Sequence, residues 1–391
     1  MIPLLLAAAL QAAPYTFSPN VPDECRVRDG LPNVLAKLTA GETVRVAYLG
    51  GSITEANGWR PKSMAWFKAT FPTAKVEEIN VAISGTGSDF SALRAKTDML
   101  GQKPDLVFLE CWVNGGGGYE QPSVEGVVRQ VWRDNPRCDI CFVYTVGQWM
   151  IADLQNGKAP WFTPVMETIA NAYGIPTVDF GLEVAKREKD GSLVFKAPGP
   201  IEGKLVFSAD GVHPGDAGHD IYRDVLARSI LSMKGVGQPG PHSLPAALGA
   251  HPWEQGELLP VDKQTRSAGW LPVDTNTDVI YREDYWRTHR MLRGATRCDK
   301  VGETITVRFD GTTVGLSDIP YGQPTIIEVS VDGGPAKAYE RKQTEARKHA
   351  RFFYLPELPP GPHTVVYTVK ELPAGQSYYA GELLIVGKLL P

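Results

Sequence analysis

The sequence predicts a three-layer α/β/α domain followed by a smaller all-β domain. Apolar runs alternate with helical stretches to about residue 235, a segment crowded with glycine and proline follows, and a period of two then dominates. Strands that alternate with helices form parallel sheets with right-handed crossovers and helices on both faces. A length of 391 residues suits two domains. We therefore expect an α/β domain over 25–235, a linker over 236–262 and a β domain over 263–391.

The elements of the α/β domain are predicted from apolar runs and helix-start residues. A polar lead-in precedes a helix over 31–38, and a long loop over 191–207 precedes the last helix. Pro61 suits the first turn of a helix, and Asp89 can cap another. The expected strands are 44–49, 76–83, 106–112, 140–146 and 177–180, and the expected further helices are 61–70, 89–100, 124–132, 162–173 and 219–233.

The last third of the chain has the pattern of antiparallel strands. Apolar and polar residues alternate over 304–309, 326–331 and 363–369. Asp332-Gly333-Gly334 is a hairpin signal, and Pro359-Pro360-Gly361 is a turn signal. Short alternating strands joined by such turns indicate a β-sandwich or a jelly roll.

Composition and charge limit the classes of partner. The net charge is −4 and 43% of the residues are hydrophobic, which does not suggest binding to nucleic acid or to an anionic membrane surface. The first 13 residues are apolar and rich in alanine, too short to span a bilayer, and typical of a secretory signal with small residues near a cleavage point. No Lys or Arg precedes this apolar run, and a disordered tail is the alternative. We expect a secreted or periplasmic protein.

The five cysteines do not indicate a metal site. Cys138 and Cys141 have the spacing of a redox or zinc motif, but no second cysteine pair or histidine cluster completes it. We expect buried thiols that act as small apolar side chains. A disulfide among Cys25, Cys111, Cys138 and Cys141 is the alternative if the chain is exported. We expect neither a metal nor another cofactor.

Polar residues follow three strands and one late loop. Ser52, Gly85 and Asn114 come after three successive expected strands, and Asp210 and His213 lie on the loop before the last helix. The carboxyl ends of parallel strands lie along one edge of the sheet, where α/β proteins place their chemistry. We therefore expect these five residues to meet in one crevice.

The five residue types are those that acyl transfer needs. A serine hydroxyl is a weak nucleophile and requires a neighbouring base, a role that His213 can fill. Asp210 can fix the tautomer and orientation of that imidazole. The backbone N–H groups of Ser52 and Gly85 and the amide of Asn114 are candidate donors to a tetrahedral oxyanion.

The motifs around these residues resemble the four sequence blocks of the SGNH hydrolases, also called GDSL-like esterases. The blocks are Gly50-Gly51-Ser52-Ile53-Thr54, Gly85 within Ala82–Thr86, Asn114, and Asp210-x-x-His213, and the resemblance covers about residues 43–235. It implies a flavodoxin-like fold and the roles just described for the catalytic residues Ser52, Asp210 and His213. With the β domain, the chain is similar to two-domain carbohydrate acetylesterases.

The sequence departs from the pattern of the family at two positions. Gly51 stands where an Asp usually precedes the nucleophile, and Gly115 stands where an Asp often follows the Asn. Neither position carries a catalytic group. The run Gly115 to Gly118 suggests a rim that is either mobile or closely approached by other groups.

Each proposed site residue has a structural alternative. Ser52 could be a helix cap, Gly85 a turn glycine and Asn114 a turn former. Asp210 could close an Asx turn, with His213 a surface residue.

Other histidines and aromatic residues are assigned to structure. His219 and His242 lack a partner pattern, and we expect them to be structural or solvated. Trp112, Trp149 and Tyr119 could line the crevice, but core packing is the favoured interpretation.

We expect a metal-independent serine esterase that acts on acyl esters, above all acetyl esters, of carbohydrate. Expected export, the appended β domain and the absence of a long apolar lid segment favour carbohydrate. A lipase, thioesterase or acyltransferase with the same triad is the alternative, and a carbohydrate-binding protein with a vestigial site is the alternative without catalysis. Aromatic residues of the β domain either stack on sugar or form its core: Tyr285, Trp286, Tyr321, Tyr378 and Tyr379. The sugar, the ester position and the oligomeric state are not encoded in a recognisable pattern.

Overall fold

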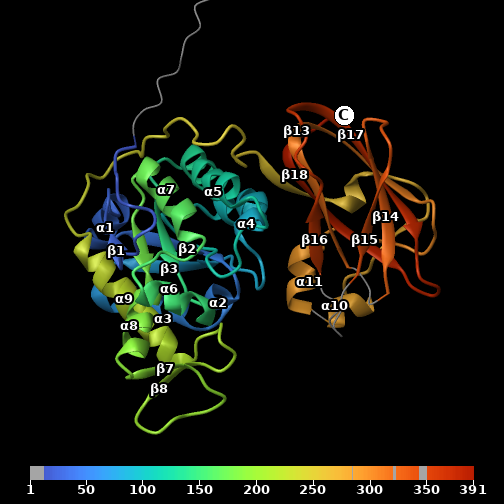
Figure 1. The fold of residues 1–391 in the computed structure, drawn as a ribbon. Coiled ribbons are helices and arrows are strands. Elements are labelled where there is room, and N and C mark those ends of the chain that lie inside the picture. Colours follow the sequence, from blue (N-terminus) through green and yellow to red (C-terminus); the bar gives the residue numbers. More distant parts are fainter. Residues whose placement is uncertain (1–12, 284, 320–322, 343–349) are drawn as a thin grey trace, which may run out of the picture. The chain divides into compact units, whose positions relative to one another are not determined.

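The computed structural model describes residues 13–283, 285–319, 323–342 and 350–391, and the chain divides into two compact units after Glu254 (Figure 1). Residues 1–12 of the expected signal segment lie outside the described residues. No helix in the described ranges is long and apolar enough to cross a membrane.

The first unit is built on a six-stranded sheet in the order β1-β6-β5-β4-β2-β3. All neighbouring strands are parallel except the short β1, which pairs antiparallel with β6. Without β1 the order is 2-1-3-4-5, which is the flavodoxin-like order, and its switch point lies between β2 and β4. The strands are β1 (Cys25–Arg26), β2 (Thr43–Gly50), β3 (Lys75–Asn80), β4 (Leu106–Glu110), β5 (Asp139–Tyr144) and β6 (Thr177–Asp179).

Helices form two layers against this sheet, which confirms the three-layer prediction (Figure 1). Helix α5 packs against α4 and α7, while α9 packs against α3 and α8. Right-handed crossovers require this division, because the chain leaves β2 toward β3 in one direction and continues from β3 to β6 in the other. The helices are α1 (Pro32–Thr39), α2 (Ser52–Glu55), α3 (Trp59–Thr70), α4 (Ser88–Arg94), α5 (Glu120–Asp134), α6 (Ile151–Gln155), α7 (Thr163–Tyr173), α8 (Phe180–Lys189) and α9 (Asp216–Ser232).

The first unit contains helices that were not predicted, among them α6 and α8, and it differs from the prediction in two further segments. The expected loop 191–207 contains β7 (Leu193–Lys196), which pairs in parallel with β8 (Leu205–Ser208). The expected helix 89–100 is divided, because α4 passes into a π-helical turn over Ala95–Met99 and a 3₁₀ turn over Leu100–Gln102.

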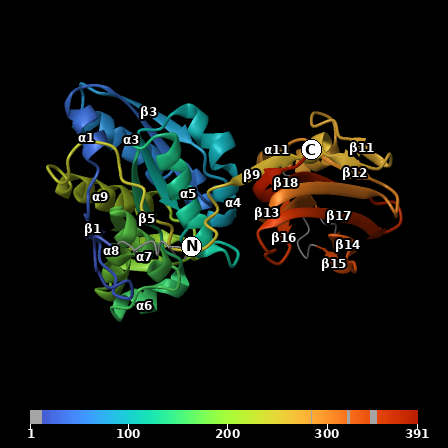
Figure 2. The same ribbon diagram turned by 90° about the horizontal axis from the view of Figure 1, so that it is seen from above.

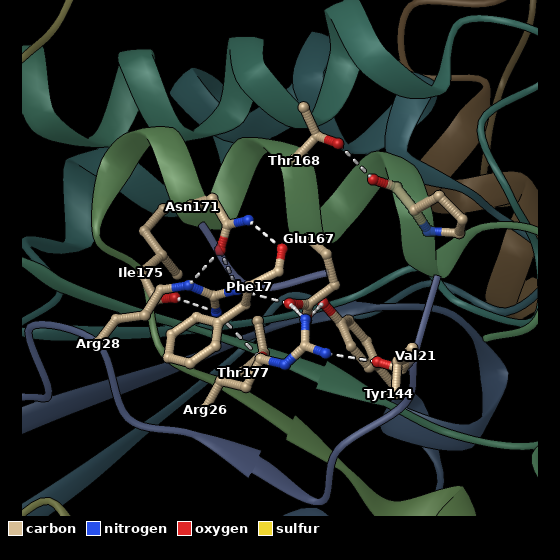
Figure 3. A network of polar contacts seen from close by, with 11 residues as sticks. Phe17, Val21, Arg26, Arg28, Tyr144, Glu167, Thr168, Asn171, Ile175 and Thr177 are labelled. Atoms are coloured by element: carbon tan, nitrogen blue, oxygen red, sulfur yellow. Dashed lines mark hydrogen bonds and ion pairs between the residues drawn. The ribbon is translucent and has the colours of Figure 1, made fainter. Parts of the chain in front are cut away.

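Two arginines hold the N-terminal segment to the first unit (Figure 3). Arg26 and Arg28 both pair with the buried carboxylate of Glu167, which also accepts a hydrogen bond from Tyr144 at 2.8 Å. The ring of Phe17 lies 5.4 Å and 5.3 Å from the two guanidinium groups. Strand β1 is thus held by ion pairing with α7 and also by its backbone pairing with β6.

All five cysteines carry free thiols. Four of them are buried and Cys25 is half-buried, which fits small apolar side chains and not the alternative of a disulfide. Within the part of the chain that the structure describes, no three His, Cys, Asp or Glu side chains are grouped to hold a metal ion.

The expected linker is divided between the two units. Trp253 is 2% exposed, and its backbone N–H donates to Pro122 of the first unit at 2.9 Å. Glu254 pairs with Arg129 at 2.7 Å. Strand β9 (Gly256–Pro260) follows directly and pairs with β18 (Tyr378–Leu389) of the second unit.

The second unit is an all-antiparallel β domain, as predicted (Figure 2). The long strand β13 pairs with β17 through its first half and with β16 through its second, and a register shift interrupts its pairing with β18 after Gly311. Alternate residues of β13, such as Ile305, Val307 and Phe309, enter one hydrophobic core. The strands are β9, β10 (Thr265–Arg266), β11 (Trp270–Pro272), β12 (Thr296–Cys298), β13 (Thr304–Ile319), β14 (Thr325–Val331), β15 (Lys337–Arg341), β16 (Arg351–Tyr354), β17 (Gly361–Glu371) and β18 (Tyr378–Leu389), with helices α10 (Val279–Glu283) and α11 (Tyr285–Met291).

Two of the aromatic residues considered for sugar stacking belong to the interior of this domain. Tyr378 is 1% exposed and donates its hydroxyl to Asp318 at 2.7 Å, and Tyr379 is 5% exposed. The stacking interpretation is therefore wrong for these two tyrosines. Tyr321 and the side chains of Tyr285 and Trp286 lie outside the described residues.

Candidate active site

The turn that carries Ser52 leaves no room for side chains at the two glycines before it. A Cβ atom on Gly50 would lie 2.6 Å from the carbonyl oxygen of Glu110, and one on Gly51 would lie 2.0 Å from the amide nitrogen of Asn114. The close approach of β4 and of the Asn114 amide therefore requires glycine at both positions. With Gly51 in place of the Asp that is usual in the resembling family, the Asn114 amide lies directly against the backbone of the turn.

Ser52, His213 and Asp210 form a continuous hydrogen-bonded chain. The Ser52 hydroxyl lies 2.8 Å from Nε2 of His213, and Nδ1 of His213 lies 2.7 Å from Oδ2 of Asp210. A carboxylate can only accept, so Nδ1 carries the proton and Nε2 is free to accept from the serine. This is the arrangement of nucleophile, base and orienting acid that acyl transfer uses.

Asp210 also organises the loop that carries His213. Its Oδ1 atom accepts from the backbone N–H groups of Val212 and His213, each at 2.8 Å, and from the Ser208 hydroxyl at 3.0 Å. One carboxylate oxygen thus closes an Asx-type turn while the other faces the imidazole. The turn-forming role and the proposed catalytic role of Asp210 are therefore compatible, because each uses a different oxygen of the side chain. Partial burial opposes ionisation, but these hydrogen bonds and the one from His213 outweigh it and hold the pKa of Asp210 well below its usual range.

The three candidate oxyanion donors come from neighbouring turns. Asn114, after β4, donates its amide to the carbonyl of Thr86 at 3.1 Å and lies against Gly51. Gly85 precedes Thr86, is exposed, and has a φ of +68°. Among the residues that the structure describes, we find no acceptor for the backbone N–H of Ser52 or Gly85. Both groups are therefore available to a ligand.

Sequence reasoning missed a buried carboxylate beneath the nucleophile turn. Glu110, at the end of β4, is 1% exposed and accepts from the hydroxyls of Thr54 and Thr145, each at 2.8 Å, and from the N–H of Gly51 at 3.4 Å. Burial raises its pKa, and the hydrogen bonds oppose that shift. A single acidic residue within the apolar run 106–112 was the available signal.

The glycine run after Asn114 is closely packed. The backbone N–H of Ser88 donates to the carbonyl of Gly115 at 2.8 Å, and a Cβ on Gly116 would lie 2.4 Å from the Ser88 hydroxyl. The Glu120 carboxylate accepts from the N–H groups of Gly116 and Gly118 at 3.2 Å and 3.1 Å. Of the two expectations for this run, close approach fits these contacts.

Both additional histidines have structural partners, as expected. His219 is 6% exposed and accepts from the backbone N–H of Trp59 at 3.1 Å, and burial lowers its pKa to about 4. His242 stacks on Trp132, with ring centroids 4.7 Å apart, and bonds Asp139 at 2.8 Å.

The three aromatic residues assigned to core packing behave differently from one another. Trp112 is 1% exposed and stacks on Tyr144, and Tyr119 is half-buried against Trp253. Trp149 is 54% exposed, so core packing is wrong for this residue.

Comparison with known proteins finds a family match within the first unit and solved structures of similar two-domain fold. Residues 48–221 match the model of the GDSL-like Lipase/Acylhydrolase family. A comparison with curated proteins found no match. The chain is similar to a two-domain esterase (CEX) active on acetylated mannans, with 21% identity, a TM-score of 0.72, and coverage of 95% of this chain and 98% of that one. The same esterase co-crystallised with mannopentaose gives the same identity and TM-score, with 92% and 94% covered.

Proposed function

We propose that the chain is a carboxylic ester hydrolase that removes acetyl groups from acetylated carbohydrate. Residues 48–221 match the model of the GDSL-like Lipase/Acylhydrolase family, which supports the hydrolase part of the proposal. The observation that carries the proposal is the hydrogen-bonded chain from Ser52 through His213 to Asp210. The carbohydrate part is supported by the two-domain esterase of similar fold, which is active on acetylated mannans.

In the first half of the proposed reaction, the serine is acylated. The Ser52 oxygen attacks the carbonyl carbon of the ester while Nε2 of His213 takes the hydroxyl proton. Asp210 stabilises the imidazolium that forms. The tetrahedral intermediate then collapses, and His213 gives the proton to the departing sugar oxygen. The products are a free sugar hydroxyl and an acetyl-serine.

In the second half, water releases the acetate. His213 takes a proton from a water molecule, which attacks the acetyl-serine, and the proton returns to the Ser52 oxygen as acetate departs. In both halves the oxyanion would accept from the N–H groups of Ser52 and Gly85 and from the Asn114 amide. Removal of one such donor typically costs a factor of about 10² to 10³ in kcat.

The proposed substrate also suggests where the protein works. Acetylated polysaccharides are too large to enter a cell, so we propose a secreted or periplasmic location. The apolar segment 1–13 supports export.

The test is acetate release from a panel of acetylated polysaccharides and oligosaccharides, with Ser52→Ala as background. A parallel series of p-nitrophenyl esters with acyl chains of increasing length measures acyl preference. We expect release of acetate from at least one glycan and a decline in kcat/KM as the acyl chain lengthens. A preference for long chains would identify a lipase instead, and glycan binding without turnover would identify a binding protein.

A further inference from the structure

Trp149 lies in the 3₁₀ turn Gln148–Met150, and Trp161 lies two residues before the first residue of α7. In the described residues, Trp149 and Trp161 are the tryptophans among the exposed large apolar side chains, at 54% and 55% exposure. Large exposed aromatic rings lose favourable burial free energy unless a ligand covers them. Their positions relative to the candidate active site therefore indicate whether a bound substrate could cover them.

Trp161 is the outermost ring of an aromatic stack. Its ring lies 5.4 Å from that of Phe162 at an interplanar angle of 25°. Phe162 stacks in turn on Trp112 at 5.8 Å, and Trp112 on Tyr144 at 4.5 Å. The three inner rings are all buried. Trp161 is thus supported on one side and half exposed, which restricts its rotamers before any ligand binds.

The Trp161 ring also contacts the loop that carries a candidate oxyanion donor. A Cβ on Gly115 would lie 2.6 Å from Cη2 of Trp161, and Gly115 has a φ of +73°. Gly115 follows Asn114 directly in the chain. The ring therefore lies beside the Asn114 end of the candidate active site.

Trp149 lies at the other end, beside the loop of the acid and base. The backbone N–H of Gln148 donates to the carbonyl of Gly211 at 2.9 Å, and Gly211 lies between Asp210 and His213. The ring of Trp149 covers Gly147, where a Cβ would lie 2.5 Å from Cη2. Hence each tryptophan belongs to a loop that contacts a different part of the same site.

We propose that Trp149 and Trp161 are stacking platforms that bind sugar rings on either side of the acetylated residue. The apolar face of a pyranose ring suits an indole surface, while its hydroxyls remain in water beyond the edge of the indole. The proposal rests on the proposed function and adds that the site recognises an oligosaccharide, with contacts to more than one sugar, and not a single acetylated monosaccharide.

The test compares two substrates across matched variants. Trp149→Ala and Trp161→Ala each remove a platform, whereas Trp149→Phe and Trp161→Phe keep an aromatic ring. Leu231→Ala is the control, because it removes an exposed apolar side chain far from the site. Leu231 lies in the last turn of α9, about 24 Å along the helix from Gly215, which is two residues after His213. The substrates are acetylated mannopentaose, or the acetylated oligosaccharide that the wild type hydrolyses best, and p-nitrophenyl acetate.

We expect each alanine variant to lose about tenfold more in kcat/KM on the oligosaccharide than on p-nitrophenyl acetate, chiefly through KM. The phenylalanine variants should recover part of that loss, and Leu231→Ala should behave as wild type. Titration of unmodified mannopentaose into the Ser52→Ala protein should quench tryptophan fluorescence, and the alanine replacements should weaken that binding.

The outcomes separate the two proposals. If the wild type releases no acetate from any oligosaccharide, the proposed function fails. If it does so and the alanine variants match it, the platforms are overturned while the function stands. Equal losses on both substrates would assign the tryptophans to support of the catalytic loops. A change of oligomeric state in the alanine variants, measured by sedimentation, would assign them to self-association, and either result overturns the proposal.

Discussion

The hydroxyl of Thr54 donates to the buried carboxylate of Glu110 at 2.8 Å, and this contact ties the nucleophile turn to the end of β4. A second hydroxyl, that of Thr145 after β5, donates to the other carboxylate oxygen, also at 2.8 Å. Glu110 therefore links the ends of three neighbouring strands at the switch point of the sheet. Because every protein partner is a donor, Glu110 is suited to act as an acceptor that positions Ser52.

Thr54→Val and Thr145→Val test this positioning role as a matched pair. Each removes one donor from a buried carboxylate and should lower the free energy of unfolding by about 1–3 kcal/mol, measured by urea denaturation. Only Thr54 lies in the Ser52 turn, so only Thr54→Val should also lower kcat on p-nitrophenyl acetate, by about tenfold. Equal effects of the two variants on kcat would show that Glu110 acts through general stability and not through the turn.

Ser52→Ala should remove nearly all esterase activity and leave the fold intact. The Ser52 hydroxyl faces His213 at 2.8 Å, and losses of about 10⁴-fold or more in kcat are typical when a triad serine is replaced. Kinetics on p-nitrophenyl acetate measure the loss, and circular dichroism with thermal unfolding checks the fold. Retention of more than about a tenth of the wild-type rate would contradict the assignment of the nucleophile.

Local sequence patterns predicted the alternation of strands and helices and placed the five candidate site residues after strands and on one late loop, because those features depend on short motifs. The flavodoxin-like order of the sheet was implied by the family resemblance and not by these patterns. Glu110 was not predicted, since its partners Thr54 and Thr145 come from separate strands and only the tertiary fold brings them together. Helix α8 was missed although its signal is local: Asp179 accepts from the N–H groups of Gly181 and Leu182 at its first turn.

The exposure of Trp149 could not be predicted, because residue type alone favours burial of an indole. What places it at the surface is the turn over Gln148–Met150, which is fixed by the hydrogen bond between Gln148 and Gly211. That contact joins segments more than sixty residues apart, and no local pattern in either segment predicts it.

His219 should make the protein less stable in mild acid. Burial, together with Lys62, lowers its pKa from the ordinary 6.5 to about 4, so the folded state keeps it neutral while the unfolded state takes up a proton below 6.5. The associated stability is present above pH 6.5 and is lost as the pH falls toward 4, by up to about 3 kcal/mol. His219→Asn keeps an acceptor for Trp59 without a titrating ring.

Urea denaturation at pH 7, 6, 5 and 4 of both proteins checks this expectation. The free energy of unfolding should fall less steeply between pH 6.5 and 4 in His219→Asn than in the wild type. Parallel curves would show that other groups carry the acid sensitivity.

Glu167→Gln should destabilise the first unit strongly. The carboxylate is the partner of both Arg26 and Arg28 in a site where the three side chains are at most 5% exposed (Figure 3). Removal of one partner of a buried ion pair leaves uncompensated charge and typically costs about 3–5 kcal/mol. Denaturation with urea measures the loss. Glu77→Gln, which weakens the surface pairs with Arg45 and Lys75, is the control and should change stability little.

A chain that ends at Glu254 should fold and keep most of its activity on p-nitrophenyl acetate. All five candidate site residues lie before it, and Trp253 and Glu254 pack against α5 of the same unit. A chain that ends at residue 240 loses these contacts, including a tryptophan that is 2% exposed, and should unfold at a lower temperature. Equal thermal midpoints for the two chains would contradict the boundary.

The chain that ends at Glu254 also tests whether the β domain helps to hold a polymeric substrate. Binding energy from remote parts of a substrate can orient the reacting ester, so loss of a binding domain should lower kcat/KM on acetylated polysaccharide much more than on p-nitrophenyl acetate. Tyr378 and Tyr379 cannot supply that binding, since both are buried in the β domain. Equal losses on the two substrates would mean that the β domain supports the stability of the esterase domain and does not bind the polymer. Polysaccharide binding by the Ser52→Ala protein, full-length and shortened, gives a second measurement that does not depend on turnover. Equal affinities of these two proteins would likewise argue against a binding role for the β domain.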